Sequence, residues 1–188
     1  MSARGLAAAV IAYLVIAVFW ALPMTARPTE RVPDLGDPLH LAWTMAWDAH
    51  ALVHQPLRLY DANAFHPYPR SLTFADHLLP EAVMVAPVFW ATGNAVLASN
   101  AAVVLALALS ATAMFLLVRH VTASPAAAFV AGLAYAFNSL TLHELPRVHV
   151  LNVQWWPLAL LWLDRFRAGG QRRDAVLAAA ALALQGLS

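Results

Sequence analysis

Polar residues that could do chemistry begin directly after the first apolar run of the chain. Gly36-Asp37 opens a helical pattern that reaches about His54, and a single polar stripe along it carries Asp37, His40, Thr44 and Asp48. A carboxylate on such a stripe could act as a general base. The structural alternatives are that Asp37 caps the helix ahead of a proline, and that Asp48 and His50 lie on a solvated helix face.

A second candidate site stands before the short apolar segment that follows. Asp76 and His77 come directly ahead of residues 78–92, where the apolar pattern suggests an interfacial helix. Backbone amides at a helix start, together with an imidazole, could hold a lipid phosphate. His77 and Asp76 are therefore candidate binding residues, whereas Asp61 in Tyr60-Asp61-Ala62-Asn63 is most simply a turn residue.

A third polar group lies further along, where two apolar segments are joined. This connection carries His143, Glu144, Arg147 and His149. Ionisable groups close to hydrocarbon are costly and usually functional, although long side chains at a boundary can also be solvated. A two-histidine metal site from His143 and His149 would fit no standard ligand spacing, so no metal and no other cofactor is predicted.

The rest of the chain indicates the elements that must position these groups. Charged residues make up 11% of the chain and the mean hydropathy is +0.65, which is too apolar for an ordinary soluble domain of this size. We expect an all-α, polytopic transmembrane helix bundle forming a single membrane domain over residues 1–188. The predicted spans are 6–25, 95–118, 123–142, 150–164 and 175–188. The predicted outer loop, 26–94, contains an interfacial helix at 77–92.

The distribution of arginine predicts the orientation of this bundle. If residues 77–92 do not cross the membrane, the inner face receives Arg4, Arg119 and the Arg165–Arg173 group, as the positive-inside rule requires. The N-terminus is then cytoplasmic and the polar groups described above face outward. The absence of lysine and the alanine-rich spans suggest a bacterial cytoplasmic (inner) membrane, and the near-neutral charge gives no sign of nucleic-acid binding.

In the order of its motifs the chain resembles the GT-C superfamily of bacterial membrane glycosyltransferases and the related YfhO-like membrane proteins. The resemblance covers most of the chain, and the motifs that carry it are Gly36-Asp37, Trp47-Asp48-Ala49-His50, Phe65-His66-Pro67-Tyr68-Pro69, Asp76-His77 and Gly93-Asn94. Because the sequence ends within an apolar helix, the chain is expected to be the N-terminal part of such a protein.

The resemblance implies that a sugar moves from a polyprenyl-phosphate donor to an acceptor on the outer face. Asp37 matches the family's catalytic base and Glu144 its second acidic residue, while Asp48 takes a lesser, orienting role. His77 and Arg147 would bind the donor phosphate, with Asp76, His40 and His149 as further binding residues. The sequence departs from the family in having Gly-Asp where an acidic pair is common, and in having no lysine.

Two alternatives to an active transferase stay open from the sequence. The first is a non-catalytic membrane protein, either a transporter or flippase for a lipid-linked substrate or an assembly subunit. Transporters commonly place charge at the bilayer midplane and carry internal repeats, whereas the polar groups here gather at one boundary and no repeat is visible. The second is a protein that keeps the GT-C scaffold without activity.

Overall fold

A computed structural model describes residues 3–188, and this part of the chain is helical with no β-strand. The helices are α1 (Ala3–Trp20), α2 (Asp37–His54), α3 (Leu79–Thr92), α4 (Ala95–Thr122), α5 (Pro125–Ala136), α6 (Ser139–His143), α7 (Val148–Leu151), α8 (Trp155–Gly169) and α9 (Arg172–Gln185). Short 3-10 turns η1 (Met24–Ala26), η2 (Pro56–Arg58) and η3 (Ser71–Phe74) lie within the connections. The all-α class predicted from the sequence is confirmed.

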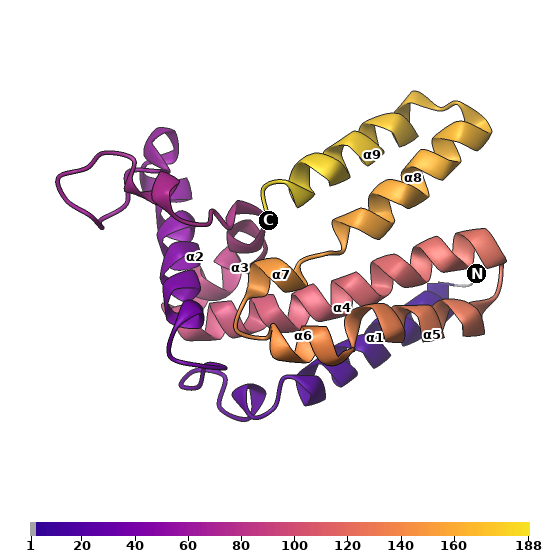
Figure 1. Cartoon of the computed structure of the whole chain (residues 1–188), viewed down its shortest axis with the longest axis horizontal. Helices are drawn as coiled ribbons and strands as arrows, with labels where there is room; N and C mark the ends of the chain where they lie inside the picture. The colour runs from indigo at the N-terminus through magenta and orange to yellow at the C-terminus, as the bar shows by residue number, and fades with distance from the viewer. Residues whose placement is uncertain (1–2) are drawn as a thin grey trace.

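Helix α4 forms the centre of the molecule, with α1 and α5 along one side of it and the α8–α9 hairpin on the other (Figure 1). The start of α1 and the turns that join α4 to α5 and α8 to α9 lie at one end. Helices α2 and α3, with the long connection between them, lie at the opposite end. The polar segments singled out in the sequence therefore gather at one end of the helix assembly.

The boundaries of the central helices follow from local capping chemistry. The side chain of Asn94 accepts a hydrogen bond from the Leu97 amide at the start of α4, and Ser124 accepts one from the Ala127 amide at the start of α5. Pro125 occupies the first turn of α5, where a missing N–H costs nothing. These signals can be recognised in the sequence, so the two helices begin close to where they are predicted.

Small residues and one tyrosine hold α1, α4 and α5 together. The Tyr13 ring stacks on Phe129 with centroids 5.0 Å apart, and its hydroxyl donates to the Phe129 carbonyl at 3.0 Å. Gly132 of α5 faces this contact: a methyl group added there would lie 2.6 Å from the carbonyl oxygen of Ala111 and would also overlap the Tyr13 hydroxyl. Glycine is thus required at 132 for the close approach of three helices.

Side-chain amides and an indole fasten the polar end to the central helix. Asn100, buried in α4, donates to the carbonyl oxygens of Pro28 at 2.8 Å and Arg31 at 2.7 Å. The indole N–H of Trp90 in α3 donates to the Ala49 carbonyl in α2 at 3.0 Å. Because these donors bind backbone groups far away in sequence, they fix the position of the segment that leads into α2.

Within the part of the chain that the structure describes, two helical segments are long and apolar enough to cross a membrane, Ala95–Thr122 and Pro125–His143. They coincide with the predicted spans 95–118 and 123–142. The apolar helices Arg4–Trp20 and Leu79–Thr92 are shorter. The continuous helix predicted over 150–164 is broken, because residues 148–151 form the separate turn α7 and α8 begins at Trp155, and α8 is not among the helices long and apolar enough to cross. The side chains of Asn152 and Gln154 are buried and make hydrogen bonds to other side chains. These two residues lie in the break between α7 and α8.

Candidate functional site

Asp37 lies in the first turn of α2 and does not cap it. The N-cap residue is Gly36, and no side chain makes a capping hydrogen bond. The Gly36 amide is instead bound by the carboxylate of Asp34 at 2.7 Å. The alternative in which Asp37 serves as the helix cap is therefore wrong, because the helix begins one residue earlier than expected and Asp37 lies inside its first turn.

The carboxylate of Asp37 takes part in a surface ion-pair cluster, which we define as Asp37, Glu144 and Arg147. Arg147 Nε donates to Asp37 Oδ2 at 3.0 Å, and Arg147 Nη1 donates to Glu144 Oε2 at 2.6 Å. The hydrogen bonds that the guanidinium donates to Glu144 and Asp37 raise the pKa of Arg147. Three of the predicted site residues, one at the start of α2 and two from the connection before α7, thus meet in one cluster.

Asp48 lies further along α2 in a different environment. Its side chain is fully buried, so the alternative of a solvated helix face for Asp48 is wrong, although His50 is exposed as that alternative expects. The reason is tertiary, since α3 packs directly on this face of α2. Asp48 Oδ2 lies 3.5 Å from Nδ1 of His77, and neither carboxylate oxygen has a hydrogen-bond partner among the described residues.

Glu81 completes a second group, the buried acid cluster, which we define as Asp48, His77 and Glu81. Glu81 is fully buried in α3, and its Oε1 accepts a hydrogen bond from Asn152 Nδ2 at 2.6 Å. Asn152 in turn accepts from Gln154 and donates to Ser188 Oγ at 2.9 Å. Sequence reasoning missed Glu81, Asn152 and Gln154 as site residues. A carboxylate inside an apolar helical segment was the signal that could have found Glu81.

Burial controls the electrostatics of this cluster. Burial, and to a lesser extent the neighbouring Glu81, raises the pKa of Asp48 to about 7. Burial also raises the pKa of Glu81 to about 7, against the opposing effect of its hydrogen bonds, and burial lowers the pKa of His77. A low-dielectric surrounding disfavours the charged form of every group, so the cluster exchanges protons near neutral pH.

A pocket of about 310 Å³ opens beside His77. It is lined by Tyr60, Ala75, Asp76, His77, Leu78, His149, Gly186, Leu187 and Ser188. The predicted binding residues His77, Asp76 and His149 therefore come together here. Arg147 is not among the lining residues, although it precedes His149 by only two positions. His40 lies elsewhere, exposed on α2 with its ring 5.8 Å from that of Trp43.

An apolar groove of about 370 Å³ adjoins this pocket and shares Leu187 with it. Its walls are mainly aliphatic side chains of α3 and α9, with Trp155, and the amides of Asn152 and Gln154 form its polar part. The two spaces together combine a polar chamber with an apolar channel. This pairing suits a ligand with a polar head and a hydrocarbon tail.

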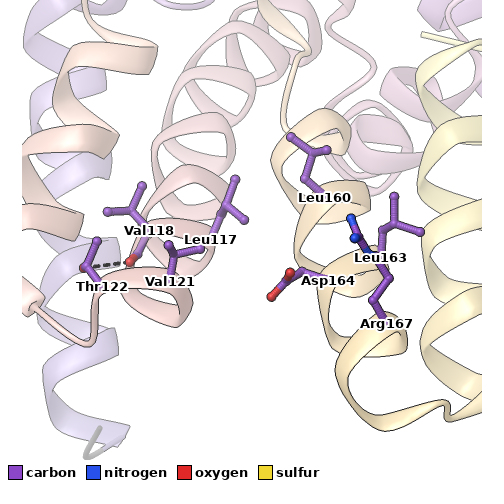
Figure 2. A pocket seen from close by; sticks show the side chains of 8 residues that line it. All are labelled: Leu117, Val118, Val121, Thr122, Leu160, Leu163, Asp164 and Arg167. Carbon is purple, nitrogen blue, oxygen red and sulfur yellow. Dashed lines mark hydrogen bonds between the residues drawn. The ribbon is translucent and has the colours of Figure 1, made fainter.

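A separate groove lies away from these clusters, between the C-terminal half of α4 and α8 (Figure 2). Leu117, Val118 and Val121 face Leu160 and Leu163 across it, and the carboxylate of Asp164 points into the gap. Asp164 Oδ2 lies 3.0 Å from His120 Nε2. None of the predicted site residues lines this groove.

Within residues 3–188, no group of three or more His, Cys, Asp or Glu side chains is arranged to hold a metal ion. Comparison with protein-family models, with curated proteins and with solved structures finds no match for the chain. The functional argument therefore depends on the geometry of the two clusters and the spaces beside them.

Proposed function

We propose that this chain carries the acceptor and donor sites of a membrane glycosyltransferase that uses a polyprenyl-phosphate-linked sugar. The observation that carries the proposal is the surface ion-pair cluster, in which Arg147 joins Asp37 to Glu144. Asp37 and Arg147 are 110 residues apart and come from the two connections that the family resemblance selects. A contact over that separation supports a shared site better than either motif alone.

Asp37 is proposed as the base that takes the proton of the acceptor hydroxyl. Its carboxylate is exposed at 56% of its side-chain surface, so an acceptor can reach it. Glu144, 14% exposed, holds Arg147 from the other side and leaves the remaining guanidinium N–H groups for an anionic ligand. In inverting transfer the acceptor attacks the anomeric carbon opposite the leaving phosphate, so Asp37 and the phosphate-binding groups would lie on opposite sides of the bound sugar.

The donor lipid is proposed to occupy the pocket beside His77 and the adjoining apolar groove. His77 and His149 would contact the phosphate, and the groove lined by α3 and α9 would take part of the prenyl chain. In this arrangement the polar end of the assembly faces the outer side of a bacterial inner membrane. The two long apolar helical segments support a membrane location, and we propose that α1, α8 and α9 also cross, which gives a multi-pass bundle with a cytoplasmic N-terminus.

The decisive experiment is a transfer assay in proteoliposomes with a radiolabelled polyprenyl-phosphate sugar. Asp37→Asn keeps the shape of the side chain and removes the base, so we expect the transfer rate to fall about a hundredfold or more while the protein still folds. The matched control is Asp61→Asn, because Asp61 only accepts a hydrogen bond from the Arg70 amide and an asparagine oxygen can do the same.

A normal rate of sugar transfer by Asp37→Asn would show that Asp37 is not the catalytic base. Movement of the labelled lipid across the bilayer without any transfer by the wild-type protein would replace the transferase by a flippase.

A further inference from the structure

We infer that Asp48 and His77 form a proton relay that opens into the pocket of about 310 Å³ and delivers a proton to the ligand oxygen bound there. The inference rests on the proposed function for the identity of that oxygen, which belongs to the leaving phosphate. His77 is the residue that meets the ligand, and Asp48 is the positioning residue behind it.

The geometry of the imidazole carries the argument. Nδ1 of His77 lies 3.5 Å from Asp48 Oδ2, while the ring itself lines the pocket. Only 13% of the His77 side chain is exposed, and Asp48 is fully buried. Within residues 3–188, the buried atoms Nδ1 and Nε2 of His77 and both carboxylate oxygens of Asp48 have no hydrogen-bond partner, and unpaired buried polar atoms of this kind are rare in folded proteins. A small movement that shortens the contact with Asp48 would leave Nε2 free for a ligand.

The neighbouring groups keep the proton available. Glu81 of α3 faces Asp48, and the pocket wall adds Asp76, the Tyr60 ring with its centroid 4.7 Å from that of His77, and His149 of α7. Burial raises the pKa of Asp48 to about 7 and lowers that of His77. Burial thus favours the neutral carboxyl form of Asp48 and the neutral ring of His77, which are the forms from which the relay starts.

The relay conserves protons and breaks no other bond. The Nε2–H of neutral His77 passes its proton to the ligand oxygen, and the carboxyl proton of Asp48 moves to Nδ1. Afterwards Asp48 is an anion, the ring is neutral with its proton on Nδ1, and the ligand oxygen carries one added proton. At the leaving phosphate this proton offsets charge that develops as the bond between the sugar and the phosphate breaks.

The test is the titration of the full chain with isotope-labelled histidine and aspartate, followed by nuclear magnetic resonance. We expect the carboxyl carbon of Asp48 to change near pH 7 and the ring nitrogens of His77 to show a step at the same pH, because loss of the Asp48 proton changes the proton held at Nδ1. Asp48→Asn should abolish the step at His77, whereas Glu81→Gln should move the common midpoint to lower pH without separating the two curves. Midpoints more than about one unit apart, or a His77 curve unchanged in Asp48→Asn, would overturn the relay.

A measurement on the unaltered chain covers the case in which a variant fails to fold. Diethyl pyrocarbonate modifies accessible imidazole nitrogens, and the modified histidines can be located by peptide mass. We expect His77 to react through the pocket, more slowly than exposed His50 and with a rate that rises through the same midpoint. No reaction at His77 under conditions that fully modify His50 would show that the ring does not open into the pocket. Neither the titration nor the rate of histidine modification depends on sugar transfer. A failed transfer assay would therefore contradict the proposed function without deciding whether the relay exists.

Discussion

Arg147 donates through Nε to the carboxylate of Asp37 at 3.0 Å and so joins the start of α2 to the connection before α7. The same guanidinium donates through Nη1 to Glu144. A planar fork with fixed N–H directions can serve two carboxylates at once, whereas an ammonium group is a single point of charge. The pairing makes the identity of the residue at 147 more important than its charge.

We expect Arg147→Lys to keep the charge and lose the function of this cluster. Lysine cannot hold Asp37 and Glu144 in the same orientation, so sugar transfer in proteoliposomes should fall at least about tenfold, close to the value for Arg147→Gln. Thermal unfolding should change little, because the pair is solvent-exposed. Equal transfer by Arg147→Lys and the wild type would mean that only the positive charge is used.

The buried carboxylates predict an unusual dependence of stability on pH. The pKa of Glu81 is raised from 4.5 to about 7 by burial, so the folded state binds a proton that the unfolded state has released. Stability from this group is therefore present below about pH 4.5 and is lost as the pH rises to 7, by on the order of 3 kcal/mol. His77, with a lowered pKa, acts in the opposite sense and opposes part of this change.

Glu81→Gln isolates that contribution. Glutamine keeps an oxygen for Asn152 and cannot ionise, so the variant should melt at a higher temperature than the wild type at pH 8 and at a similar temperature at pH 5. The measurement is thermal unfolding in detergent at the two pH values. A wild-type melting temperature that rises steadily from pH 5 to pH 8 would contradict the assignment of Glu81 as a buried acid.

Gly132→Ala should separate α5 from α1 and α4. The added methyl group would meet the Ala111 carbonyl oxygen, which belongs to a helix backbone and cannot move aside easily, as well as Tyr13. We expect a loss of about 1–3 kcal/mol in unfolding free energy, seen as a lower melting temperature. Gly169→Ala at the end of α8 is the matched control, because nothing lies within 4 Å of a methyl group there. Similar melting of both variants would show that the three helices are not in close contact.

Helix α3 is predicted to lie at the interface and not to cross the bilayer. If α3 does not cross, Arg119 and the Arg165–Arg173 group fall on the inner face, and α3 also carries the buried Glu81. Reporter fusions after Asn94 should therefore give an outer location, and fusions after Ala123 a cytoplasmic one. A cytoplasmic reporter after Asn94 together with an outer reporter after Ala123 would contradict both this prediction and the five-span topology.

Local patterns in the sequence determined the helices and where several of them begin. The helix from Asp37 to His54, the short helix after His77 and the starts of α4 and α5 can be predicted from apolar runs, Asn94, Ser124 and the prolines, because capping and hydrophobic length act between near neighbours. The grouping of polar residues at one end also follows from the order of these elements.

Tertiary structure alone decided which of the polar residues lie together and which are buried. Asp37 and Asp48 belong to one stripe of α2, yet Asp37 is paired with Arg147 at the surface while Asp48 is enclosed against His77 and Glu81. Spacing along a helix fixes the direction of a side chain but not what packs on that face. The packing of α3 on α2, and of the α7 segment beside both clusters, brings together residues too far apart in sequence for any local pattern to relate them.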